Sequence, residues 1–117
     1  MTTKAEQERV CATYGVPWVE APENLKVGIA LHTLDLVPLN GLRHPPESGI
    51  TGWFIWGGTE LPPDADFFAP LCVAHLPEKC PLVLPYLGLP PGYRFLIDQA
   101  GYEDVWFDEK LMHEPAA

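Results

Sequence analysis

The chain has 117 residues, of which 47% are hydrophobic and 20% are charged, and its formal net charge at pH 7 is -9. This length is enough for one domain with its own core and too short for two. The acidic balance weighs against a nucleic-acid-binding protein, because phosphate backbones are held mainly by clustered Lys and Arg, and no apolar run is long enough to span a bilayer.

The first residues and the cysteines predict a cytoplasmic protein. The opening segment MTTKAEQERV lacks the apolar core of a secretory signal. Cys11, Cys72 and Cys80 are an odd number of cysteines without a CxxC pair. This pattern favours free, buried thiols in a reducing compartment over a disulfide framework.

The first half of the chain predicts a helix, a strand and a long loop. The helix is expected from Thr3 to Tyr14, because Gly15 and Pro17 then end it. The segment from Leu25 to Leu31 alternates apolar residues on one face, which is the period of a half-buried strand. The segment from Asp35 to Gly49 contains three prolines and two glycines, so we expect an ordered loop there.

The segment from Gly52 to Trp56 predicts the central strand of a sheet. Its apolar side chains fall on both faces, which indicates a strand that is covered twice. We therefore assign Trp53 and Ile55 to the structural core, together with Trp106 from the last predicted strand. Trp56 points to the opposite face and is a candidate for contact with a partner.

The second half of the chain completes an α+β pattern. A helix is expected near residues 76–88, and Pro85 should shorten it, kink it or divide it into two turns. Strands are expected from Tyr93 to Ile97 and from Glu103 to Phe107, close enough together to form a hairpin. Residues 1–117 are thus predicted to form a single α+β domain with a mainly antiparallel sheet of about four strands.

Few residues are arranged for catalysis or for metal binding. The sequence has no G-x-S-x-G nucleophile elbow and no glycine-rich phosphate loop. Cys72 and His75 could form a thiolate pair, or with Cys80 supply three zinc ligands. The surroundings are apolar, which raises the pKa of a thiol, and no fourth ligand is identifiable, so buried structural cysteines are favoured. We expect no catalytic residue, no metal and no cofactor.

Two features suggest contact with a partner. Arg43 and His44 lie together in the stiff loop GLRHPP, which leads into the tryptophan-rich central strand. Between Asp98 and Glu114 there are six acidic residues against Lys110 alone. This acidic stretch is either a solvated face that keeps the protein soluble or a surface that steers a cationic partner.

Several segments of the sequence carry the motifs of a bacterial protein family. They are Gly41–Pro46, Gly52–Trp56 and Asp66–Phe68, followed by LPPGYRFL and YEDVWFDE. On these motifs the chain resembles immunity protein family 33, formerly catalogued as a domain of unknown function and assigned to polymorphic toxin systems. The likeness covers roughly residues 25 to 112.

The resemblance implies a small cytoplasmic protein without enzymatic activity that binds and neutralises a cognate protein toxin. It carries over the motif positions Arg43, Trp53, Trp56, Glu103, Asp104 and Trp106. Joined with the acidic charge, it gives the candidate residues for binding a basic toxin as Arg43, His44, Trp56, Glu103, Asp104, Asp108 and Glu109. Neither nucleic acid nor a membrane is expected as a partner.

Two other functions stay open on the sequence. One is a regulatory or scaffold interaction domain that has no toxin partner. The other is a small ligand-binding domain that uses the loop with Arg43 and His44. The second would require a deep pocket lined by Arg43, His44 and Trp53.

Overall fold

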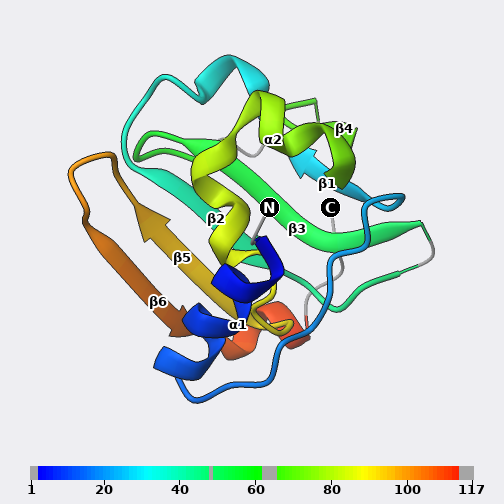
Figure 1. The fold of residues 1–117 in the computed structure, drawn as a ribbon. Helices are drawn as coiled ribbons and strands as arrows, with labels where there is room; N and C mark the ends of the chain where they lie inside the picture. Colours follow the sequence, from blue (N-terminus) through cyan, green and yellow to red (C-terminus); the bar gives the residue numbers. More distant parts are fainter. Residues whose placement is uncertain (1–2, 48, 62–65, 114–117) are drawn as a thin grey trace.

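A single sheet runs through the computed structural model, which describes residues 3–47, 49–61 and 66–113 (Figure 1). In these residues it has six strands in the order β4-β1-β3-β2-β5-β6. They are β1 (Lys26–Ile29), β2 (Leu39–Arg43), β3 (Ile50–Gly57), β4 (Ala69–Cys72), β5 (Tyr93–Ile97) and β6 (Glu103–Phe107). β1 is parallel to β3, and the other neighbouring pairs are antiparallel. The predicted α+β class with a mainly antiparallel sheet is confirmed, with six strands instead of about four.

Short helices flank the sheet. They are α1 (Thr3–Thr13), α2 (Leu76–Lys79) and the 3-10 helices η1 (Leu31–Thr33), η2 (Val73–His75), η3 (Pro81–Tyr86) and η4 (Glu109–Met112). The helix expected near residues 76–88 is divided in two, because the non-helical backbone of Cys80 (φ -155°, ψ 70°) separates α2 from η3, which contains Pro85. No helix in the described part of the chain has the length and apolar character needed to cross a bilayer.

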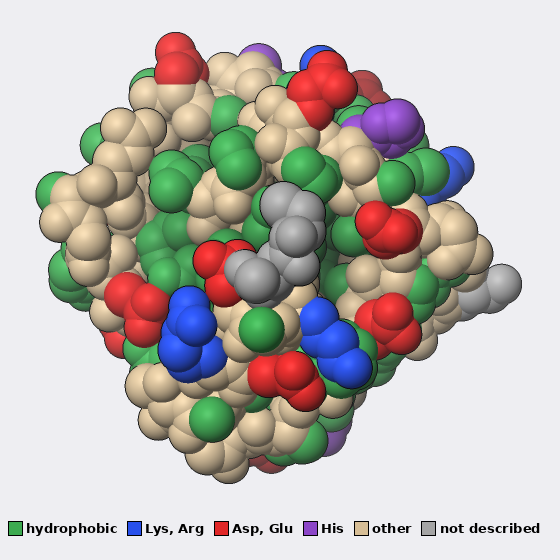
Figure 2. Space-filling model, in the orientation of Figure 1, with side chains coloured by type: hydrophobic (Ala, Val, Ile, Leu, Met, Phe, Trp, Pro, Cys, Tyr) green, Lys and Arg blue, Asp and Glu red, His purple; other side chains and the backbone are tan. Residues whose placement is uncertain are grey.

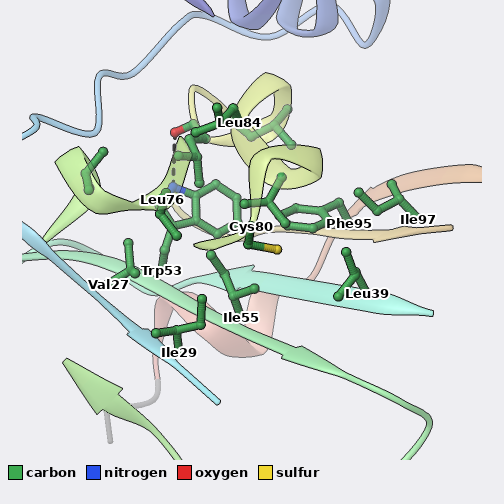
Figure 3. Close-up of a cluster of buried hydrophobic side chains, with 14 of the residues drawn as sticks. Val27, Ile29, Leu39, Trp53, Ile55, Leu76, Cys80, Leu84, Phe95 and Ile97 are labelled. Atoms are coloured by element: carbon green, nitrogen blue, oxygen red, sulfur yellow. Dashed lines mark hydrogen bonds between the residues drawn. The ribbon is translucent and has the colours of Figure 1, made fainter. Parts of the chain in front are cut away.

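The main core lies between the sheet and the layer formed by α1, α2 and η3 (Figures 1 and 3). Trp53 is its largest side chain and is only 1% exposed. Its indole Nε1 donates a hydrogen bond to the carbonyl oxygen of Leu87, 3.0 Å away, and its ring lies 5.5 Å from that of Phe95. The apolar body of Trp53 therefore fills the core while its polar atom is satisfied, as a buried tryptophan requires.

A second, smaller cluster covers the opposite face of the sheet. Its buried members are Ala30, Leu42, Phe54, Trp56 and Leu111, and Phe67 and Phe68 pack against it. Since Trp53 and Ile55 point to the main core while Phe54 and Trp56 point to this cluster, β3 is covered on both faces, as the sequence predicts.

β2 and β4 lie where the sequence predicts loops or connections. The loop expected from Asp35 to Gly49 contains β2, which pairs with both β3 and β5. Only glycine fits at position 41 of this strand, because a Cβ atom added there would stand 2.1 Å from Cε2 of the Phe95 ring. β4 contains Pro70 and forms an edge of the sheet, where a proline does not interrupt the ladder of hydrogen bonds.

Candidate functional site

Arg43 is a buried structural residue, although the sequence suggests it as a partner contact. Its side chain is 1% exposed at the end of β2. The guanidinium donates to five backbone carbonyl oxygens, those of Thr51 (3.0 Å), Val19 (2.9 Å), Leu89 (2.9 Å), Leu87 (3.4 Å) and Glu20 (3.0 Å). Burial lowers the pKa of Arg43 to about 10. Arg43 thus ties residues 19–20 and 87–89 to the sheet and presents no atom to a partner.

His44 and Trp56 also lie inside the protein. His44 is 8% exposed, its Nδ1 is 3.2 Å from the carbonyl oxygen of Leu111, and its ring meets Phe54 edge-on at 5.7 Å. Trp56 is 3% exposed and packs against Phe68, with 6.0 Å between ring centres. With Arg43 and His44 both buried, the loop GLRHPP does not supply the walls of an open ligand pocket.

Glu103 is held by two tyrosines. Its carboxylate accepts a hydrogen bond from the Tyr14 hydroxyl at 2.6 Å and another from the Tyr86 hydroxyl at 2.5 Å. Burial and the hydrogen bond to Glu103 raise the pKa of Tyr14 to about 12, and the same two causes raise the pKa of Tyr86. Since Tyr14 follows α1 and Tyr86 ends η3, Glu103 connects both to β6.

The other three acidic candidates differ in how strongly the fold engages them. Asp108 accepts from Arg94 Nη1 at 3.1 Å and from the backbone N–H of Lys110 at 3.1 Å, where it caps η4. The hydrogen bond from Arg94 is the main reason why the pKa of Asp108 is lowered. On the surface, Glu109 Oε2 lies 3.5 Å from His113 Nε2, and Asp104 is exposed on β6. Only Asp104 and Glu109 therefore combine high exposure with weak engagement.

Trp106 does not belong to the core to which the sequence assigns it. It is partly buried, and the guanidinium of Arg94 lies over its ring with Cζ 5.5 Å from the ring centre. Along β6, Val105 points to the main core and Trp106 to the opposite face, where cover is thinner. The alternation of the strand explains the difference.

The three cysteines and His75 differ in how far they are buried. Cys80 and Cys11 are buried, which raises the pKa of each thiol, while Cys72 is half-buried and His75 is exposed. Within residues 3–47, 49–61 and 66–113, no three His, Cys, Asp or Glu side chains gather as metal ligands.

An exposed apolar ridge lies outside every motif of the sequence. We define the ridge as Leu36 and Val37, which are 50% and 62% exposed. On one side lies a hollow of about 410 Å³, lined by apolar residues of the 34–39 and 80–82 segments and by Asp35, Lys79 and Asp98. On the other lies a hollow of about 360 Å³, lined by residues 57–60, Thr33 and Phe67. Figure 2 shows hydrophobic side chains gathered on this part of the surface.

Hydrogen bonds fix the ridge to the end of the sheet. Asn40 Nδ2 donates to the carbonyl oxygens of Pro38 (3.3 Å), Trp56 (3.3 Å) and Gly58 (2.8 Å). The Gly58 N–H donates to Pro38, and the Leu36 N–H donates to Thr33. The only signal in the sequence is the run Leu34-Asp35-Leu36-Val37, which places apolar residues in a loop that has no periodic pattern.

The chain matches one family model over most of its length. Residues 6–108 match the family model described as the Imm33-like domain. The chain belongs to the Imm33-like domain family. The resemblance to immunity protein family 33 is therefore confirmed. No curated protein and no solved structure gives a significant match.

The matched region of the Imm33-like domain contains both the buried arginine and the ridge. It runs from the first turn of α1 to Asp108, so it includes all six described strands and leaves out η4. The polar side chains inside it, such as Arg43 and Glu103, make internal hydrogen bonds. The exposed apolar side chains at the end of the sheet form a patch on the surface of this domain.

Proposed function

We propose that this Imm33-like domain is a non-enzymatic immunity protein that binds and neutralises a cognate toxin in the bacterial cytoplasm. The observation that carries the proposal is the family match over residues 6–108. The proposal is also supported by the hydrogen bonds that Arg43 and Glu103, two of the motif residues, make within the fold. Inhibition by binding needs a stable surface and no reacting group.

The toxin is basic in this proposal. The formal net charge of -9 attracts a cationic protein and speeds its encounter with the surface. Of the candidate residues Glu103, Asp104, Asp108 and Glu109, the exposed carboxylates of Asp104 and Glu109 contribute most directly to this attraction. Asp108 and Glu103 contribute charge as well, although both also make hydrogen bonds within the domain.

We expect the gene next to this one to encode the toxin, and the test is rescue of growth from that protein. Cells that carry the inducible toxin are compared with and without the Imm33-like domain, and binding of the two purified proteins is measured by calorimetry. We expect growth to be restored and a complex to form. Equal killing with and without the domain, when both proteins are produced at matched levels, would contradict the proposal and favour a regulatory interaction domain.

A further inference from the structure

We propose that the apolar ridge is the docking surface for a segment of the toxin that inserts an apolar side chain flanked by basic residues. This inference rests on the proposed function and adds the place and chemistry of contact. Leu36 is 50% exposed and Val37 is 62% exposed, although Leu and Val side chains are usually buried. Together with the half-exposed Leu82 across the larger hollow, they form an apolar patch with a concave centre.

The larger hollow has the size and the apolar lining needed to receive a side chain of the partner. Its volume of about 410 Å³ is lined by Leu34, Leu36, Leu39, Cys80, Pro81 and Leu82. Protein interfaces concentrate their affinity in apolar pockets that exclude water when a partner's side chain enters. The ridge and this hollow therefore offer both a knob and a socket on one surface.

The surface is ordered before any partner arrives. Gly57 lies so close to the η1 turn that a Cβ atom added to it would stand 2.1 Å from the Thr33 carbonyl oxygen, and the Gly57 N–H donates to Thr33 Oγ1 at 2.8 Å. Leu36 packs against Gly58, where an added Cβ atom would lie 3.3 Å from Leu36 Cδ1. A preformed surface loses little conformational entropy on binding, which favours tight association.

The charges around the ridge select a basic partner. Asp35 and Asp98 line the larger hollow against Lys79, and Glu60 lines the smaller one. Further acidic residues follow along the same end of the sheet, because Glu103 pairs with Ile97, the residue before Asp98. A second copy of the chain would bring another formal charge of -9 to this surface. Charge complementarity thus favours a cationic protein over self-association.

The experiment measures the affinity of the inactivated toxin from the adjacent reading frame for three single variants and the unaltered domain. Leu36→Lys and Leu82→Lys place a cation on the ridge and on the opposite wall of the hollow. Met112→Lys is the matched control, because Met112 and Leu82 are both 41% exposed and Met112 lies beside Gly92, at the other end of β5. Thermal unfolding is measured for all of them.

We expect Leu36→Lys and Leu82→Lys each to weaken binding at least about 30-fold and Met112→Lys to change it less than about threefold. Unchanged binding by both Leu36→Lys and Leu82→Lys, with the unaltered domain binding and neutralising the toxin, would overturn the docking surface and leave the proposed function intact. If the unaltered domain does not bind the toxin, the proposed function fails and the docking surface fails with it. A dimer of the unaltered domain that Leu36→Lys dissociates in sedimentation would instead make the ridge a contact between copies and overturn the proposal.

Discussion

The guanidinium carbon of Arg43 lies 5.6 Å from the centre of the Trp53 ring. Both side chains are only 1% exposed, so solvent does not reach the contact between the cation and the ring. A desolvated cation–π contact is worth about 2 kcal/mol and helps to offset the cost of burying the charge. Arg43, which the sequence suggests as a contact for a partner or ligand, is thus packed against a residue of the main core.

Replacing Arg43 tests how much its buried contacts stabilise the fold. Arg43→Met should lower the free energy of unfolding by at least about 3 kcal/mol, because several buried carbonyl oxygens lose their donor and each costs about 1–3 kcal/mol. Arg94→Met is the control and should cost no more than about 1 kcal/mol, since Arg94 and Asp108 form a partly exposed ion pair. Urea unfolding followed by circular dichroism gives both values. Similar losses in the two variants would show that the five carbonyl contacts matter little.

Trp53 and Trp106 should differ in their contributions to stability. Trp53→Ala removes a buried indole and should lower the free energy of unfolding by about 3–5 kcal/mol. Trp106→Ala should cost clearly less, because Trp106 is only partly buried. Urea midpoints and slopes measured on the two variants decide this. A larger loss of unfolding free energy for Trp106→Ala would mean that the thinly covered face contributes more to stability than the main core.

Tyr14 and Glu103 should make stability fall at high pH. The folded-state pKa of Tyr14 is about 12, above the ordinary value of 10.0, so its contribution is complete below pH 10 and is lost as the pH rises towards 12. In Tyr14→Phe this contribution is absent, and the fall in stability between pH 10 and pH 12 should be shallower. Urea midpoints taken at half-unit pH steps provide the measurement. Parallel curves for the two proteins would contradict the assignment.

Charge reversal on the surface should slow association without unfolding the domain. The double variant Asp104→Lys/Glu109→Lys should reduce the association rate with a basic toxin several-fold at low salt. The difference should shrink in 0.5 M NaCl because salt screens the attraction. Stopped-flow mixing measures the rates, and an unchanged rate at low salt would remove the steering role. Glu103 and Asp108 are left unaltered because they accept hydrogen bonds that hold the fold.

Strands with a clear alternation can be predicted from this sequence, whereas strands that depend on their neighbours cannot. β5 and β6 have the bounds that their pattern predicts, and α1 ends one residue before the predicted end. Pro38 and Gly41 make β2 hard to predict, because a glycine weakens an isolated strand. The need for glycine at position 41 follows only from the folded structure, where the ring of Phe95 packs against it. β4 is hidden by Pro70, which is acceptable only because this strand lies at an edge.

The candidate site shows the same limit. An arginine beside a histidine in a Pro-rich loop suggests contact with a ligand or partner, and nothing local reveals that residues 19–20 and 87–89 bring carbonyl oxygens to it. Conversely, Leu36 and Val37 carry no motif. Their proposed role depends on exposure and on the hollows beside them, which are properties of the folded surface.

The carbonyl groups around Arg43 also have a kinetic meaning. They come from positions that are 8 to 46 residues away along the chain, so the guanidinium can give up its water only after these distant segments have met. We expect contacts of this kind to form after the main folding barrier and to break before it is crossed in the reverse direction. Arg43 should therefore govern how long a folded molecule lasts before it opens, while the rate at which the chain folds depends on other residues.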